Sequence, residues 1–180
     1  MAHVAGHSGG ACQVGCPHQR DQRMTCPWQE AWVEQHSVLL WESFSYWTGE
    51  KLVVATGELA SLGTALFHAP QVIVSHDAQS DPRFNYANQM ALDLWETTWD
   101  QLIGLPSRYS AEPEWQPERQ HVLQQVQQQG WAKDYQGIRI SRRGRKFLIC
   151  NAILWNVIDA AGNLYGQAAT FHQWRWLDEP

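Results

Sequence analysis

Residues 71–105 constrain the fold of this chain more than any other stretch. They begin with a short β-branched run at 71–76, and the Asp81-Pro82 pair that follows favours a turn. Residues 84–88 then alternate large apolar with polar side chains, which is the two-residue period of a half-buried strand. Asn88 stands where its side-chain oxygen can cap a helix. The stretch therefore predicts two short strands that lead directly into a helix.

The helix predicted after Asn88 is short, and a second short helix follows it. Ala91, Leu92 and Trp95 recur at helical spacing. Thr98 is a suitable N-cap for the second helix, which we expect to end near residue 102. Two strands followed by two short helices are the beginning of many sensor folds.

Length and charge exclude several classes of protein. The chain has 180 residues, 44% of them hydrophobic, which suits one domain with a real core and with extensions. Its net charge of −5 gives no general attraction to nucleic acid or to an anionic membrane. No stretch approaches the roughly 20 apolar residues of a spanning helix, and the N-terminus lacks the pattern of a secretory signal. We therefore expect a cytoplasmic protein that binds neither nucleic acid nor membrane.

Residues 1–27 are rich in Gly, His, Gln and Cys and have almost no apolar periodicity, which predicts a disordered tail. Cys12, Cys16, His18 and Cys26 are four potential zinc ligands. The second close pair of ligands that is typical of a zinc site is missing, so a loose tail is favoured over a metal site. A start of translation at Met24 is a further alternative, because foldable sequence begins only near residue 27.

Residues 28–69 predict a helical extension ahead of the strands. The first helix carries an apolar row and should end at Thr48-Gly49. A second helix should end before Pro70. The extension either covers the core of its own domain or forms a dimer interface, and the two interpretations are nearly balanced. His36 is expected to be a packed histidine rather than a ligand. The apolar residues concerned are Val33, Leu40, Phe44 and Trp47 in the first helix, and Leu59, Leu62 and Leu66 in the second.

The second half of the chain predicts one helix and three strands. The helix begins at Pro117-Glu118, has an apolar stripe of Val122, Leu123 and Val126, and ends at Gly130. Strands are expected at 131–141, 145–158 and 164–176. The resulting α+β domain, at 70–180, has a five-stranded antiparallel sheet of order 2-1-5-4-3 with helices on one face. A small ligand would bind between the sheet and the helices.

Several motifs of the chain together resemble the MEKHLA domain, a family related to PAS domains. The resemblance covers about residues 27–177. The most specific motifs are SH at 75–76, DPRFNYAN at 81–88, ALDLW at 91–95, LPSR at 105–108, SAEP at 110–113, YQGIRIS at 135–141 and GQAATF at 166–171.

This resemblance implies a PAS-like fold and a role in sensing or in protein interaction. The family occurs at the C-terminus of plant class III homeodomain–leucine-zipper factors and as small stand-alone proteins of bacteria and cyanobacteria. This chain shows no homeodomain, basic region or heptad repeat, so it resembles the stand-alone form. No catalytic residues and no established ligand carry over, which leaves the cofactor unknown.

Three functions therefore compete. The favoured one is a non-catalytic sensory or ligand-binding module, a homodimer that passes its signal to a partner protein. The second is a protein-interaction module with a filled core and no ligand. The third is a small-molecule enzyme.

The chemistries that need particular residues are poorly supported. A cysteinyl-flavin photosensor needs a reactive cysteine in the helix at 94–102, which has none, and Cys150 is expected in a strand. His121 is a solitary candidate for ligating haem iron. Ser107, His76 and Asp77 suggest a triad, but no nucleophile-elbow motif surrounds the serine. The Glu112 and Glu114 pair lacks a defined site, and the basic residues between Arg139 and Lys146 are typical of a solvated hairpin.

Polar residues within otherwise apolar segments are the better candidates for binding a ligand. A buried arginine among them would need a carboxylate partner, which Glu112 or Asp93 could supply. A purely structural network of the same residues is the favoured alternative, because buried polar groups need partners whether or not a ligand exists. The candidates are Asn88, Trp95, Arg108, Tyr135, Arg139, Asn151, Asn156 and Gln167.

Overall fold

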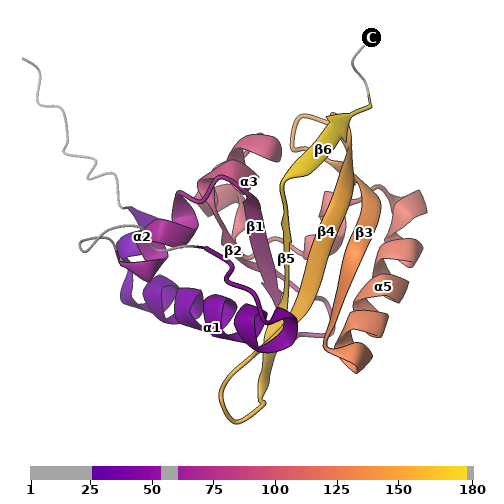
Figure 1. Cartoon of the computed structure of the whole chain (residues 1–180). Helices are drawn as coiled ribbons and strands as arrows, with labels where there is room; N and C mark the ends of the chain where they lie inside the picture. Colours follow the sequence, from indigo (N-terminus) through magenta and orange to yellow (C-terminus); the bar gives the residue numbers. More distant parts are fainter. Residues whose placement is uncertain (1–25, 54–60, 178–180) are drawn as a thin grey trace, which may run out of the picture.

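The computed structural model describes residues 26–53 and 61–177. The potential zinc ligands Cys12, Cys16 and His18, the alternative start Met24, and Leu59 lie outside the described residues. The elements, in chain order, are η1 (Pro27–Gln29), α1 (Ala31–Thr48), α2 (Leu62–Phe67), β1 (Val72–Asp77), β2 (Phe84–Ala87), α3 (Gln89–Leu94), α4 (Trp99–Leu102), η2 (Ser107–Ser110), η3 (Pro113–Trp115), α5 (Gln116–Gln129), β3 (Trp131–Ile140), β4 (Lys146–Ile158), β5 (Leu164–Phe171) and β6 (Gln173–Trp176) (Figure 1). No helix in these two segments combines the length and apolarity needed to cross a membrane.

The strands form one antiparallel sheet whose order, β2-β1-β5-β4-β3, confirms the prediction. The predicted last strand, 164–176, is divided into β5 and β6, and both halves pair with β4. The division falls at His172, opposite a point where Asn151 of β4 has a left-handed backbone with φ of 53°. The sheet therefore has a sixth short strand that continues the path of the fifth.

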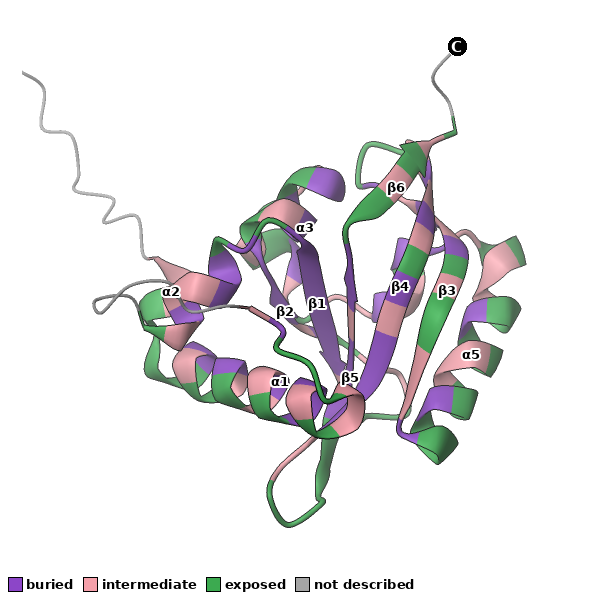
Figure 2. Cartoon of the chain, viewed as in Figure 1, coloured by how far each residue is buried: buried purple, intermediate pink, exposed green. Residues whose placement is uncertain are grey.

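Helices cover both faces of the sheet. On the inner face, α3, α4 and α5 enclose the larger cluster of buried side chains. On the outer face, α1 runs across the strands (Figure 2). Its Val33, Leu40 and Phe44 are buried and pack into a second cluster. The Phe44 ring meets the Trp155 ring edge-on, with 5.0 Å between the centroids. The apolar row predicted for the first helix thus packs against the sheet of its own chain.

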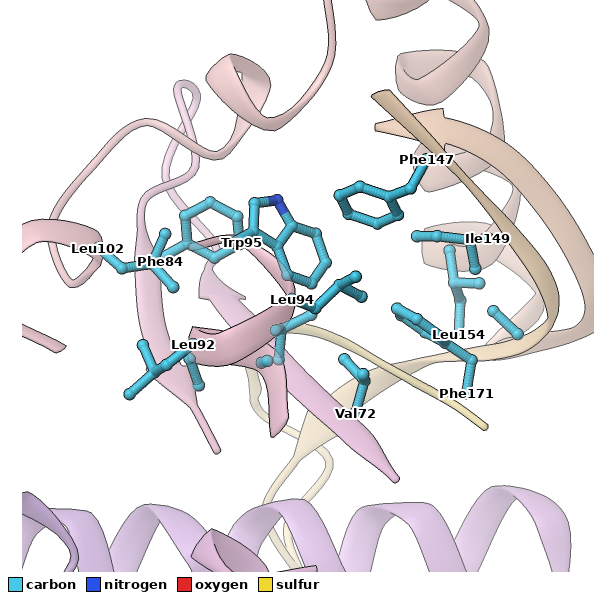
Figure 3. Close-up of a cluster of buried hydrophobic side chains, with 14 of the residues drawn as sticks. Val72, Phe84, Leu92, Leu94, Trp95, Leu102, Phe147, Ile149, Leu154 and Phe171 are labelled. Atoms are coloured by element: carbon cyan, nitrogen blue, oxygen red, sulfur yellow. The ribbon is translucent and has the colours of Figure 1, made fainter. Parts of the chain in front are cut away.

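The inner cluster is built around an aromatic centre. Trp95, which follows α3, lies between Phe84 of β2 and Phe147 of β4 (Figure 3). Its ring meets Phe147 edge-on at a centroid distance of 5.1 Å and Phe171 at 6.4 Å. Edge-to-face packing of this kind is favoured by the ring quadrupoles. These contacts join the α3 end to β4 and β5, the central part of the sheet.

A buried asparagine joins the first strand to the first inner helix. The Oδ1 of Asn88 accepts hydrogen bonds from the backbone N–H groups of Ile73 at 3.0 Å and Ala91 at 3.1 Å. Its Nδ2 donates to the carbonyl of Gln71 at 2.7 Å and to that of Ala69 at 3.4 Å. Asn88 is therefore the N-cap of α3, as predicted, and also connects that cap to β1.

Two further hydrogen bonds fasten α1 to the sheet. Because the Ser75 hydroxyl donates to Asn85 Oδ1 at 2.6 Å, its oxygen accepts from the Nε2–H of His36 at 2.9 Å. The indole N–H of Trp47 donates to the Asn156 carbonyl at 2.8 Å. His36 is therefore a packed histidine, as expected.

Replacing Asn88 by alanine tests this connection. We expect N88A to lower the free energy of unfolding by about 2–4 kcal/mol, because the cap is lost and buried backbone groups lose their partners. Thr98, the N-cap of α4, makes no capping hydrogen bond through its side chain, so T98A should change stability by less than about 0.5 kcal/mol. Urea unfolding followed by circular dichroism measures both, and equal effects of the two substitutions would contradict the role of Asn88.

Candidate ligand-binding cavity

Two β-bulges lie side by side in the pairing of β3 with β4. Asp134 and Asn151 have left-handed backbones, with φ of 57° and 53°. The register shifts on both sides of Tyr135, which pairs with Ala152. Asparagine and aspartate tolerate this backbone region better than most residues. A bulge inserts one residue and so changes which later side chains face inwards.

The bulges lie beside a cavity of about 60 Å³ between the inner face of the sheet and α5. Apolar side chains from β1, β2, β4 and β5 form most of its wall, and the polar groups come from β1, β3, β5, η2 and α5. The lining residues are Val74, Ser75, His76, Phe84, Trp95, Ser110, Arg119, Leu123, Tyr135, Arg139, Ile149, Ala152, Leu154, Gln167, Ala168, Ala169 and Phe171.

Four of the predicted ligand contacts line this cavity: Trp95, Tyr135, Arg139 and Gln167. Arg139 is buried, and its Nη2 donates to the Tyr135 hydroxyl at 2.8 Å. The Tyr135 phenol lies over Gly137, where any side chain would collide with it. Gln167 Nε2 donates to the Leu123 carbonyl at 2.9 Å and to Asn156 Oδ1 at 3.0 Å. The glutamine therefore holds α5 to the sheet as well as lining the cavity.

The other predicted contacts lie elsewhere. Asn88 is occupied as the cap described above. Asn151 is exposed at the bulge, where its Nδ2 donates to Gln173 Oε1 at 3.1 Å. Arg108 forms an ion pair with Asp81 and stacks on Tyr109, so it joins two loops instead of facing the cavity.

Asn156 is also absent from the cavity wall. It is buried, and its Nδ2 donates to the Gln127 carbonyl at 3.1 Å. Together with Gln167 it fastens α5 to the sheet. Four of the polar candidates therefore make structural contacts outside the cavity: Asn88, Arg108, Asn151 and Asn156.

Sequence reasoning missed Arg119 and His76, two buried residues of the cavity wall. A signal for Arg119 was present, because it stands four residues before Leu123 and seven before Val126, on the same face of the helix. His76 was considered only as part of a triad. It lies on β1 two residues after Val74 and so shares that inner face.

Within the described residues, the two arginines make hydrogen bonds only to neutral acceptors. Arg119 Nη2 donates to Ser107 Oγ at 2.8 Å, and Arg139 Nη1 donates to the Ile138 carbonyl at 2.7 Å. The pKa of Arg119 is lowered to about 10, mainly by burial and in smaller part by the nearby charge of Arg139. Arg119 is therefore still charged at neutral pH.

His76 is neutral and has one nitrogen without a partner. Its Nδ1 lies 2.8 Å from the carbonyl oxygen of Asp77, so Nδ1 carries the proton and donates. Its Nε2 is then an acceptor, and nothing in the described residues donates to it. Burial lowers the pKa of this imidazole to about 4, and the charge of Arg119 contributes to the lowering.

The residues considered for catalysis or haem do not assemble in the described part of the chain. Ser107 Oγ accepts from Arg119, and His76 bonds the backbone of Asp77 rather than its carboxylate. His121 is exposed on α5, and Cys150 of β4 is absent from the cavity wall. Glu112 pairs with Lys146 at 2.8 Å, while Glu114 is exposed.

Comparison with known proteins places these features in a family. The MEKHLA domain model matches residues 34–176. Two curated relatives, the homeobox-leucine zipper proteins HOX29 of Oryza sativa subsp. japonica and subsp. indica, are each 27% identical over 124 and 128 residues. These matches cover 67% and 71% of this chain but only 14% and 15% of the relatives. The chain thus spans about a seventh of their length.

Solved structures show the same fold. A light-oxygen-voltage domain studied with a flavin analogue has a TM-score of 0.52 and 21% identity, over 67% of this chain and 87% of that one. An RNA-binding light-oxygen-voltage receptor has a TM-score of 0.53 and 16% identity, over 66% and 36%. At this identity the likeness concerns the fold alone.

The two packed histidines predict how stability depends on pH. The pKa values of His36 and His76 are lowered from 6.5 to about 4 by burial, so the unfolded chain takes up protons first as the pH falls. The free energy of unfolding should therefore fall between pH 6.5 and 4, by up to roughly 1.4 kcal/mol per pH unit for each histidine.

Urea unfolding across this pH range checks the effect. H36Q and H76Q should each reduce the slope by about half, whereas H121Q, which changes an exposed residue of α5, should leave it unchanged. Carboxylates contribute equally to the pH dependence of every variant, so their contribution cancels when the slopes of two variants are subtracted. A double variant with the same slope as the wild type would contradict the assignment.

Proposed function

This chain belongs to the MEKHLA domain family, and we propose that it is a non-catalytic sensory module that binds a small molecule in the cavity between the sheet and α5. The main support for this proposal comes from the side chains that line the cavity. Arg119, Arg139 and His76 are buried there, in a largely apolar setting, without ionic partners among the residues that the structure describes. A concave apolar site with a few convergent polar groups is the usual form of a binding site for small molecules.

The size of the cavity indicates a small ligand. At about 60 Å³ it is well below the roughly 300–1,000 Å³ of sites for drug-sized molecules. One of the structural neighbours was studied with a flavin analogue, but a flavin needs far more room than this cavity gives. The cavity wall also contains no cysteine. We therefore do not extend flavin chemistry to this chain.

A second candidate function, protein interaction, is favoured by the exposed aromatic side chains of α1. Trp32 is 46% exposed and Tyr46 is 71% exposed, while the row that faces the sheet is buried. Tyr46 also borders a groove of about 500 Å³ between α1 and the turn that joins β4 to β5. This surface is the one we propose for a homodimer or for the partner protein that receives the signal.

Native mass spectrometry of the protein purified from its own host tests ligand binding. We expect an additional small mass that is lost on denaturation. A152L should abolish it, because Ala152 is buried in the cavity wall and the larger side chain fills the space. A160L changes an exposed alanine in the turn after β4 and should keep the bound mass. Repeated empty preparations of the wild-type protein would favour the interaction function instead.

Size-exclusion chromatography with light scattering tests the α1 surface. We expect a dimer at tens of micromolar, and Y46A should raise its dissociation constant by about tenfold or more, because an exposed aromatic at an interface is a typical hot spot. Y109A is the control, since Tyr109 is similarly exposed but lies in the loop beside Arg108. A monomeric wild-type protein under these conditions would exclude the homodimer.

A further inference from the structure

Among the described residues, the cavity wall holds two positive charges and no negative one. Arg119 and Arg139 are each 8% exposed, and the charge of Arg139 contributes to lowering the pKa of Arg119. A buried charge is normally matched by an opposite charge or a metal. Neither arginine has an acidic partner within residues 26–53 and 61–177.

The acidic residues that could have matched these charges have other partners. Glu112, one candidate, forms its ion pair with Lys146 outside the cavity. Asp93, the other, is exposed on α3 and accepts a hydrogen bond from Gln89 at 2.8 Å. The described part of the domain thus leaves the charge of its cavity uncompensated.

Two neutral groups of the same wall also lack partners. The Nε2 of His76 is a buried acceptor without a donor, and the indole N–H of Trp95 is a buried donor without an acceptor. A ligand that supplies the missing partners therefore needs negatively charged acceptor atoms for the two arginines. It also needs one O–H or N–H group that donates to His76.

We propose that the cavity binds a short hydroxy carboxylate, with the carboxylate held by Arg119 and Arg139 and the hydroxyl donated to His76. This inference rests on the ligand-binding function proposed above and names its ligand class. A planar carboxylate matches the fork of N–H groups of a guanidinium. The carbon skeleton packs against Phe84, Ile149 and Leu154, which also line the cavity.

The size and polarity of the cavity narrow the range of ligands that fit it. A cavity of about 150 Å³ holds benzene, so 60 Å³ suits a skeleton of about two to four carbons. Phosphate and sulfate present oxygens on all sides and would leave several of them against the apolar wall. A carboxylate has its charge at one end, which agrees with polar groups gathered in an otherwise apolar cavity.

The wild-type protein allows a test that needs no substitution. Heteronuclear NMR titrations compare glycolate and lactate with glycolamide and lactamide, which keep the size and the hydroxyl but lack the charge. We expect the hydroxy acids to shift the amide resonances of Arg119, Tyr135 and Arg139, and the indole N–H of Trp95, at millimolar concentration. The neutral amides should bind at least about tenfold more weakly, because hydrogen bonds to a charged group are the stronger ones.

Substitutions then test which side chains bind the carboxylate and the hydroxyl of the ligand. R119Q and R139Q should each weaken lactate binding by about tenfold or more, while R142Q, at the exposed turn after β3, should not. Removing the hydroxyl, with propionate in place of lactate, should weaken binding roughly two- to tenfold in the wild type and have no effect in H76F. R119Q should also unfold at a higher urea concentration than the wild type without ligand, because it removes an uncompensated buried charge.

The outcomes separate this inference from the proposed function. A bound mass that is neutral or cationic would overturn the carboxylate assignment and leave ligand binding intact. Phosphate or sulfate binding as tightly as lactate would also overturn it. A wild-type protein that carries no bound mass and responds to none of these probes would overturn both. Loss of stability in R119Q, with lactate binding retained, would make Arg119 a structural residue.

Discussion

The two β-bulges in the pairing of β3 with β4 decide which side chains reach the cavity. Before the bulges, Ala132 and Ile149 face inwards. Strict alternation would then turn Asp134 and Asn151 inwards, but the inserted residues place Tyr135 and Ala152 there instead. The same shift sends Trp155 to the outer face, where its indole N–H donates to Ser43 Oγ at 3.1 Å beneath α1. The two bulges thus determine both which side chains line the cavity and how α1 packs on the outer face.

This irregularity also explains how far the sequence could predict the molecule. The order of the strands followed from the hairpins together with the PAS-like topology that the resemblance implies, and the capping role of Asn88 followed from its place before an apolar helix. The inward face of β4 could not be read, because an asparagine at a bulge looks the same in sequence as a buried one. Asn151 was a candidate for that reason. Arg119 was readable from its helical spacing, although a charged residue is rarely buried.

Unpartnered polar atoms are not by themselves a sign of a ligand in this protein. Among the described residues, Ser45 of α1 and Thr170 of β5 also have buried hydroxyl oxygens without a hydrogen-bond partner. A hydroxyl left in this way costs only a few kcal/mol at most, whereas an ionised group without a counter-charge costs far more. Charge is what distinguishes the inner face, where two guanidinium groups share one apolar space.

Strand β1 connects the cavity to the helix that carries the exposed aromatic residues. Adjacent residues of a strand point to opposite faces, so His76 lines the cavity while Ser75 accepts from His36 of α1. His36 is therefore linked to His76 through its hydrogen bond to the Ser75 side chain and the peptide bond between Ser75 and His76. A ligand that moved His76 by even a fraction of an ångström would displace Ser75, because tightly packed strands transmit strain. In the function proposed above, β1 would link the ligand on one face of the sheet to the partner surface on the other.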